Sequence, residues 1–143
     1  MGIFHNDIVS HSNENIFIAH EKAFQDRNKL TKLLKNLEAK IDNFQFIEIS
    51  DSEIPLKNII DSYLLNSQLA TNGQNEMMLI LPEEVKSYET CMAWLDKLKQ
   101  ISDIKLYDFV NIRQSMMNGG GPACLRLKVV LDENETKELN QNF

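Results

Sequence analysis

Short β-branched runs alternate with stretches of helical periodicity in this chain, and no other feature of the sequence limits its fold as strongly. Leucine and isoleucine recur at helical spacing between Leu30 and Ile41, which predicts a helix within Glu21–Ile41. The run that follows, Phe44–Ile49, is aromatic and β-branched and alternates as a strand does. Alternating helices and strands indicate the α/β class.

The same alternation returns further along the chain. A second apolar stripe predicts a helix over about Pro55–Leu69, and the polar stretch Ala70–Gln74 predicts a loop. Glu76–Leu81 is typical of a short apolar strand, and Pro82 is expected to open a third helix. Ile104–Val110 predicts one more strand after that helix.

The two ends of the chain add further strands. Gly2–Val9 and Ile16–Ala19 are joined by the polar stretch His11–Asn15, which predicts a hairpin. Near the other end, Leu125–Leu131 alternates apolar and polar residues and predicts a strand. The expected order is ββαβ, then α, β, α, β and β. This order shows two units of similar make-up in a single domain, residues 1–143.

The composition excludes several classes of function. The chain has 15 basic and 21 acidic residues, and its net charge of −6 includes no cluster of cations that would bind nucleic acid. Its longest apolar run, Met77–Leu81, is far too short to span a membrane. Met1–Ser10 lacks the regions of a signal peptide, and two cysteines cannot build a disulfide framework. We therefore expect a cytoplasmic protein with reduced thiols, with neither nucleic acid nor membrane as a partner.

A glycine-rich stretch carries the first candidate for chemistry. Gly119–Gly121 permit a close approach of the backbone to a ligand, and Pro122 fixes the direction of entry into the next strand. Cys124 would then stand where a nucleophile could face a pocket, with Arg126 favouring the thiolate. Two other interpretations stay open. Cys124 could be a small buried hydrophobic residue beside a turn, or the glycines could cradle a phosphate. Cys91 lies among apolar helix positions and is expected to be core packing.

The histidines provide the second candidate. If Gly2–Val9 is a strand, His5 and Asp7 point to the same side, and an imidazole beside a carboxylate suits general acid/base catalysis. A purely structural histidine is the alternative. His11 and His20 lie in the predicted turn and at a strand-to-helix junction. Their spacings form no recognised metal set.

One long stretch resembles a known family. Arg113–Leu127, which contains the run Asn-Gly-Gly-Gly-Pro-Ala-Cys, closely resembles the nucleophile segment of the N-succinylarginine dihydrolases. Four further stretches resemble the same family in the same order: Gly2–Asp7, Ala19–Glu21, Tyr63–Leu69 and Met77–Pro82. The resemblance covers nearly the whole chain.

The resemblance implies both a fold and a reaction. The family belongs to the guanidino-group-modifying enzymes, whose fold is a pseudo-five-fold α/β propeller of ββαβ units around one active site. The order expected from the periodicity agrees with about two such ββαβ units, so the resemblance implies an incomplete part of the propeller. The implied reaction converts N-succinylarginine and water to N-succinylornithine, ammonia and carbon dioxide in arginine catabolism, with no metal or organic cofactor.

The resemblance also implies roles for four residues. Cys124 would be the nucleophile that attacks the guanidinium carbon and forms a covalent thiouronium intermediate. His5 would protonate the leaving ammonia and then activate water. Asp7 would hold the guanidinium, and Asn118 matches a further substrate-binding position.

The family's enzymes are longer on both sides, and their catalytic acidic residue lies upstream of the matching segment. This comparison predicts that the chain is a partial catalytic domain with little activity alone. Its expected partners are the small-molecule substrate and either a second copy of the chain or a complementary chain. Two other functions remain as alternatives: a catalytically incompetent fragment that packs with a partner, and an α/β domain reused as a binding module.

Overall fold

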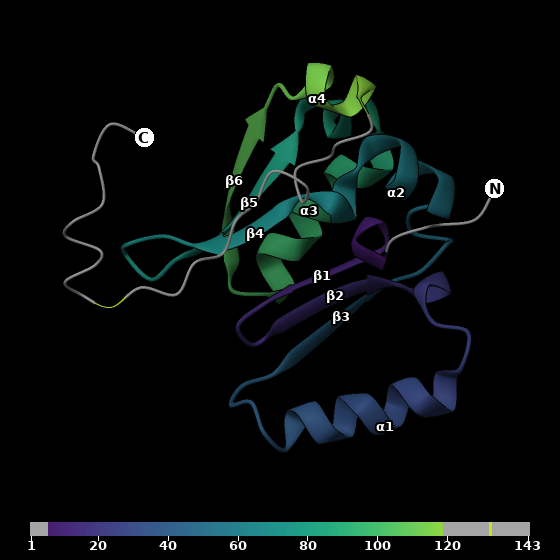
Figure 1. The fold of residues 1–143 in the computed structure, drawn as a ribbon, viewed down its shortest axis with the longest axis vertical. Helices are drawn as coiled ribbons and strands as arrows, with labels where there is room; N and C mark the ends of the chain where they lie inside the picture. The colour runs from purple at the N-terminus through teal and green to yellow at the C-terminus, as the bar shows by residue number, and fades with distance from the viewer. Residues whose placement is uncertain (1–5, 119–131, 133–143) are drawn as a thin grey trace.

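The computed structural model describes residues 6–118 and 132 (Figure 1). Its described part contains two three-stranded sheets, each with one long helix between its second and third strands. No helix in this part is long and apolar enough to cross a membrane. The α/β class expected from the periodicity is therefore confirmed.

The first sheet is built from the N-terminal half of the described chain. β1 (Ser10–Asn13) pairs antiparallel with β2 (Ile16–His20), and β2 pairs parallel with β3 (Gln45–Ile49). α1 (Arg27–Glu38) makes the crossover, and the Asp26 carboxylate caps it by accepting from the Lys29 N–H at 3.0 Å.

The second sheet repeats this topology. β4 (Gln68–Thr71) pairs antiparallel with β5 (Met77–Pro82), and β5 pairs parallel with β6 (Ile104–Val110). α3 (Glu89–Ile101) connects β5 to β6. Both sheets thus have the order ββαβ. The sequence predicts this order for the first half, whereas for the second half it predicts α, β, α, β and β, so β4 is a strand that the sequence analysis does not expect.

The repeat extends to the shorter elements. Each hairpin is preceded by a 3₁₀ turn, each crossover begins with another 3₁₀ turn, and each third strand is followed by a short helix. The six elements are η1 (Asn6–Ile8), η2 (Glu21–Ala23), α2 (Leu56–Ser62), η3 (Leu64–Asn66), η4 (Glu83–Ser87) and α4 (Arg113–Met117). We call η1 to α2 the first unit and η3 to α4 the second unit.

One hydrophobic core joins the two units. The core is formed by the inward side chains of the β-strands, the apolar face of α3 and the buried leucines of η3. Its fully buried members include Ile16, Ile18, Ile49, Ile59, Leu64, Leu65, Leu69, Leu79, Leu81, Leu95 and Leu98. The apolar stripes of the sequence therefore point to where the core forms.

β1 and β4 lie side by side at the seam between the units (Figure 1). Hydrogen bonds cross this seam in order: Asn66 to the Asp7 carbonyl, His11 to the Ser67 carbonyl, Asn13 to the Thr71 hydroxyl, and the Thr71 hydroxyl to the Glu14 carboxylate. Because the partners advance together along both strands, β1 and β4 run in the same direction. The two sheets therefore share one polarity.

Several predicted elements are confirmed. β3 and β5 match the predicted strands to within one residue at each end, and β6 matches Ile104–Val110. α1 lies within the predicted Glu21–Ile41 helix. Asp51 accepts from the Leu56 N–H at 2.9 Å at the start of α2.

The first hairpin is displaced from its predicted position. Its first strand is Ser10–Asn13 rather than Gly2–Val9, because the polar stretch expected as a turn is itself a strand. Asn6–Ile8 forms the 3₁₀ turn η1, and residues 1–5 lie outside the described part. β1 carries polar residues because its side chains bond across the seam, which removes the apolar alternation that a strand usually shows.

The second predicted helix is also too long. α2 ends at Tyr63, whose φ of 57° is in the left-handed region, so the chain turns there and β4 follows. The third helix is interrupted, because η4 and α3 meet at Tyr88 in an extended conformation. The predicted strand Leu125–Leu131 lies outside the described residues.

Candidate functional site

Two of the candidate substrate residues, Asp7 and Asn118, are described by the structure, and both lie towards the same end of the strands. β1 and β4 begin there, and β2, β3, β5 and β6 end there, as follows from the pairings and the shared direction of β1 and β4. We call this the η1–η3 end, because the turns η1 and η3 precede β1 and β4. Asp7 lies in η1, and Asn118 follows α4, the helix after β6. The topology therefore brings these two predicted substrate residues to the same end.

Asp7 is the described residue with the clearest functional geometry. Its side chain is half-buried, and its Oδ1 is shielded from solvent without a hydrogen-bond partner among the described residues. The backbone carbonyl of Asp7 accepts from Nδ2 of Asn66 at 3.1 Å. A shielded carboxylate oxygen is costly unless a cation or donor meets it, so Asp7 can receive a positively charged group.

Asn118 lies in a more open position. It caps the C-terminus of α4, where its Nδ2 donates to the Gln114 carbonyl at 3.2 Å, and its side chain is exposed. Its amide oxygen can still accept from a ligand.

His5 and Cys124 lie outside the described residues. The argument that strand alternation places His5 and Asp7 on one face is wrong, because Asp7 lies in a 3₁₀ turn. The assignment of His5 as acid/base and Cys124 as nucleophile therefore still rests on the family resemblance.

Cys91 is a core residue, as expected. It is fully buried in α3, and its Sγ lies 3.7 Å from the Ser62 hydroxyl. Burial raises the pKa of the Cys91 thiol. Its thiolate is therefore disfavoured at neutral pH, which is unsuitable for a nucleophile.

His20, the last residue of β2, has a structural role close to the η1–η3 end. It is fully buried, its Nε2 donates to the Ile54 carbonyl at 3.1 Å, and its Nδ1 accepts from the Lys22 N–H at 3.2 Å. These partners fix the neutral tautomer that carries its proton on Nε2. Asp51 lies 3.7 Å from Nε2, and its bonds from Lys22 and the Leu56 N–H lower its pKa.

His11 is also buried, in β1 rather than in a turn. Its Nδ1 lies 3.4 Å from the Ser67 carbonyl across the seam, so Nδ1 is the donor. Within the described ranges no three His, Cys, Asp or Glu side chains gather as a metal site requires.

The sequence interpretation missed two residues at the η1–η3 end. Asn66 is 2% exposed and bonds to the turn that carries Asp7. Glu84, in η4 after β5, has a shielded Oε2 without a hydrogen-bond partner in the described part of the chain. The signal for Asn66 is a polar residue that directly follows Leu64 and Leu65, whereas Glu84 is one charged residue within the predicted third helix and carries no distinct signal.

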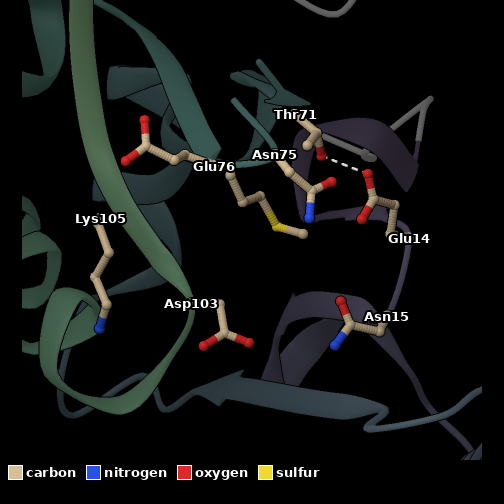
Figure 2. Close-up of a pocket in the computed structure, with 8 residues that line it drawn as sticks. Glu14, Asn15, Thr71, Asn75, Glu76, Asp103 and Lys105 are labelled. Carbon is tan, nitrogen blue, oxygen red and sulfur yellow. Dashed lines mark hydrogen bonds between the residues drawn. The ribbon is translucent and has the colours of Figure 1, made fainter. Parts of the chain in front are cut away.

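A separate hollow of about 430 Å³ lies at the opposite end of the strands (Figure 2). It lies where the two hairpin turns meet the start of β6, and Glu14 and Thr71 are hydrogen-bonded on its wall. The residues that line it are Glu14, Asn15, Thr71, Asn75, Glu76, Met77, Asp103 and Lys105. This set holds no nucleophile of the kind that attacks a guanidinium carbon, so the hollow is distinct from the candidate site.

A family model described as succinylarginine dihydrolase matches residues 1–143, the whole chain. The match confirms the resemblance to this family. It supports a hydrolase function in arginine catabolism. The chain belongs to the succinylarginine dihydrolase family.

Proposed function

We propose that this chain carries the nucleophile, the acid/base and a substrate carboxylate of a site that hydrolyses the guanidino group of N-succinylarginine. The observation that carries the proposal is the family match over residues 1–143. In the reaction, two waters convert the substrate to N-succinylornithine, carbon dioxide and two ammonia molecules. The strand repeat is consistent with two units of a pseudo-five-fold propeller.

Asp7 would recognise the substrate by charge. A guanidinium is planar and presents several N–H donors, and a carboxylate accepts them in pairs. The shielded Oδ1 of Asp7 has no partner among the described residues, so a bound guanidinium would satisfy it. Asn118 would add a neutral contact from the same end of the strands.

Cys124 and His5 would carry out the covalent chemistry. The Cys124 thiolate forms a bond to the guanidinium carbon, and His5 gives a proton to the nitrogen that leaves as ammonia. Water, deprotonated by His5, attacks the thiouronium carbon and releases the thiolate with a ureido product. A second attack and hydrolysis release the second ammonia and a carbamate, which loses carbon dioxide.

A pair of alkylating probes tests this proposal without requiring turnover. Chloroacetamidine is a cation that resembles a guanidinium, and chloroacetamide is its neutral counterpart. Each rate of Cys124 labelling, measured by peptide mapping, is divided by the rate with free N-acetylcysteine. We expect a preference of roughly tenfold for the amidine, which falls towards one in Asp7→Asn. An equal rate for both probes in the parent chain would contradict the proposal.

A second candidate function is assembly with a partner chain or a second copy. Three apolar side chains of the second unit are exposed to solvent: Met117 at 81%, Ile101 at 48% and Leu106 at 37%. Exposed apolar side chains can take part in a contact between chains. Light scattering of the purified chain tests this candidate: a dimer that dissociates in Met117→Lys supports it, and a monomer contradicts self-association.

A further inference from the structure

The internal repeat places Asp7 and Asn66 in equivalent turns of the two units. Asp7 lies in η1, the 3₁₀ turn before the first hairpin, and Asn66 lies in η3, the 3₁₀ turn before the second. The two turns are in contact at the seam. We infer that Asn66 is a positioning residue of the candidate site, which holds the turn that carries Asp7 in place. This inference rests on the proposed function only for the role of Asp7.

The contact itself is well defined. Nδ2 of Asn66 donates to the backbone carbonyl of Asp7 at 3.1 Å, between residues of different units. Asn66 is 2% exposed, so water cannot readily replace this bond. Removing the Asn66 amide would leave the part-buried Asp7 carbonyl without this donor. The loss of stability is then larger than for a hydrogen bond at the surface.

Asn66 is itself held firmly by the second unit. The left-handed residue Tyr63 ends α2, and its carbonyl accepts from the Asn66 N–H at 3.0 Å. Leu64 and Leu65 are buried in the core on one side of Asn66. On the other side, the Ser67 hydroxyl donates to the Leu64 carbonyl at 2.6 Å. A side chain fixed by such a turn can impose its geometry on a neighbouring turn.

Asp7 needs this kind of support. Its turn has only three residues, and the next tie to the sheet is the bond from the His20 N–H to the Val9 carbonyl at 2.9 Å. A carboxylate discriminates a guanidinium from a neutral group only when its oxygens are held in the plane of the donors. Loss of the Asn66 bond should therefore weaken discrimination, beyond any loss of stability.

The chain offers a matched control on the same seam. Nδ2 of Asn13 donates to the Thr71 hydroxyl at 3.1 Å, also between the two units. Asn13 lies at the far end of β1, away from Asp7. Asn66→Leu and Asn13→Leu each remove one amide from the seam at similar volume. Only Asn66→Leu removes a hydrogen bond to the turn that carries Asp7.

The test uses the full 143-residue chain and two measurements. Hydrogen exchange reports the order of the backbone at Asp7–Val9. The ratio of Cys124 labelling by chloroacetamidine and chloroacetamide reports cation recognition. An unfolded fraction labels Cys124 without selectivity and so lowers the ratio. Each ratio is therefore measured where the variant is at least nine-tenths folded by circular dichroism. Asn66→Gln, which restores an amide donor, serves as the conservative rescue variant.

We expect exchange at Asp7–Val9 to be roughly tenfold faster in Asn66→Leu, the equivalent of one lost hydrogen bond. The amidine preference should fall severalfold in Asn66→Leu, recover in part in Asn66→Gln, and be kept in Asn13→Leu. Unchanged exchange in Asn66→Leu, or the same loss of preference in Asn13→Leu, would overturn the inference. If exchange is faster in Asn66→Leu but the parent chain shows no amidine preference, the result supports the positioning role of Asn66 and contradicts the proposed function.

Discussion

Nε2 of His20 donates to the carbonyl oxygen of Ile54 at 3.1 Å and thereby ties the end of β2 to the turn before α2. Neither residue is exposed to solvent. On its other nitrogen the same ring accepts from the Lys22 N–H, which caps η2. One neutral imidazole therefore satisfies two backbone groups just behind the η1–η3 end.

The first prediction concerns that imidazole. His20→Leu keeps an apolar volume but leaves a carbonyl and an N–H without their partner. We expect the free energy of unfolding to fall by about 2–4 kcal/mol, since each unsatisfied buried group costs about 1–3 kcal/mol. Urea denaturation followed by circular dichroism measures it. Asn13→Leu is the control, and a loss in His20→Leu no larger than in that control would show that the ring bonds contribute little.

The second prediction concerns acid stability at Asp51. Lys22 and the Leu56 N–H lower the pKa of Asp51 below its ordinary value of 3.8. A lowered pKa in the folded state means that the stabilisation is present above the unfolded value and is lost as pH falls through the folded value. The melting temperature of the parent chain should therefore exceed that of Asp51→Asn near pH 6, and the difference should shrink below about pH 4. A constant difference from pH 6 to pH 2 would be inconsistent with this assignment.

The third prediction compares the two thiols. Cys91 is buried in the core and burial raises its pKa, so its thiolate is scarce near neutral pH. Iodoacetamide at low excess should label Cys124 well before Cys91, as read by peptide mapping. Cys91→Ser should leave the rate at Cys124 unchanged. Preferential labelling of Cys91 would count against Cys124 as the nucleophile.

The fourth prediction concerns turnover. A guanidinium is a poor electrophile and must be held by several groups, whose positioning can supply about 7–11 kcal/mol of the barrier. Asp7 is the one carboxylate assigned to this role, and Asn118 is exposed to water. We expect the purified chain to release ammonia from N-succinylarginine far more slowly than a longer family member, with little change in Cys124→Ala. Fast release that disappears in Cys124→Ala would show that the chain assembles a complete site.

The elements predicted correctly are those whose side chains enter the core. β3, β5 and β6 are apolar on the buried side, and α1 has a leucine stripe, so periodicity alone locates them. β1 was missed because its side chains bond across a polar seam. β4 was missed because it falls on the end of the predicted helix Pro55–Leu69, which in the structure ends at Tyr63, and on the predicted loop Ala70–Gln74. Nothing in a local pattern indicates that Asn13 meets Thr71, since they are far apart in sequence.

The candidate site was predictable only in part. Asp7 and Asn118 came from the family resemblance, and the topology brings both to one end. Asn66 was not predicted, because its role follows from the repeat of two turns and from a contact between units. His5 and Cys124 stay predictions.

Protection of Cys124 by the substrate tests most directly whether Cys124 and Asp7 form one guanidino site. The rate of Cys124 alkylation by iodoacetamide is measured with increasing N-succinylarginine, and N-succinylnorleucine, which has no guanidino group, is the control. We predict saturable protection by N-succinylarginine alone, weakened roughly tenfold or more in Asp7→Asn because a charge-assisted pair is lost. Equal protection by both compounds, or protection unchanged in Asp7→Asn, would contradict the account.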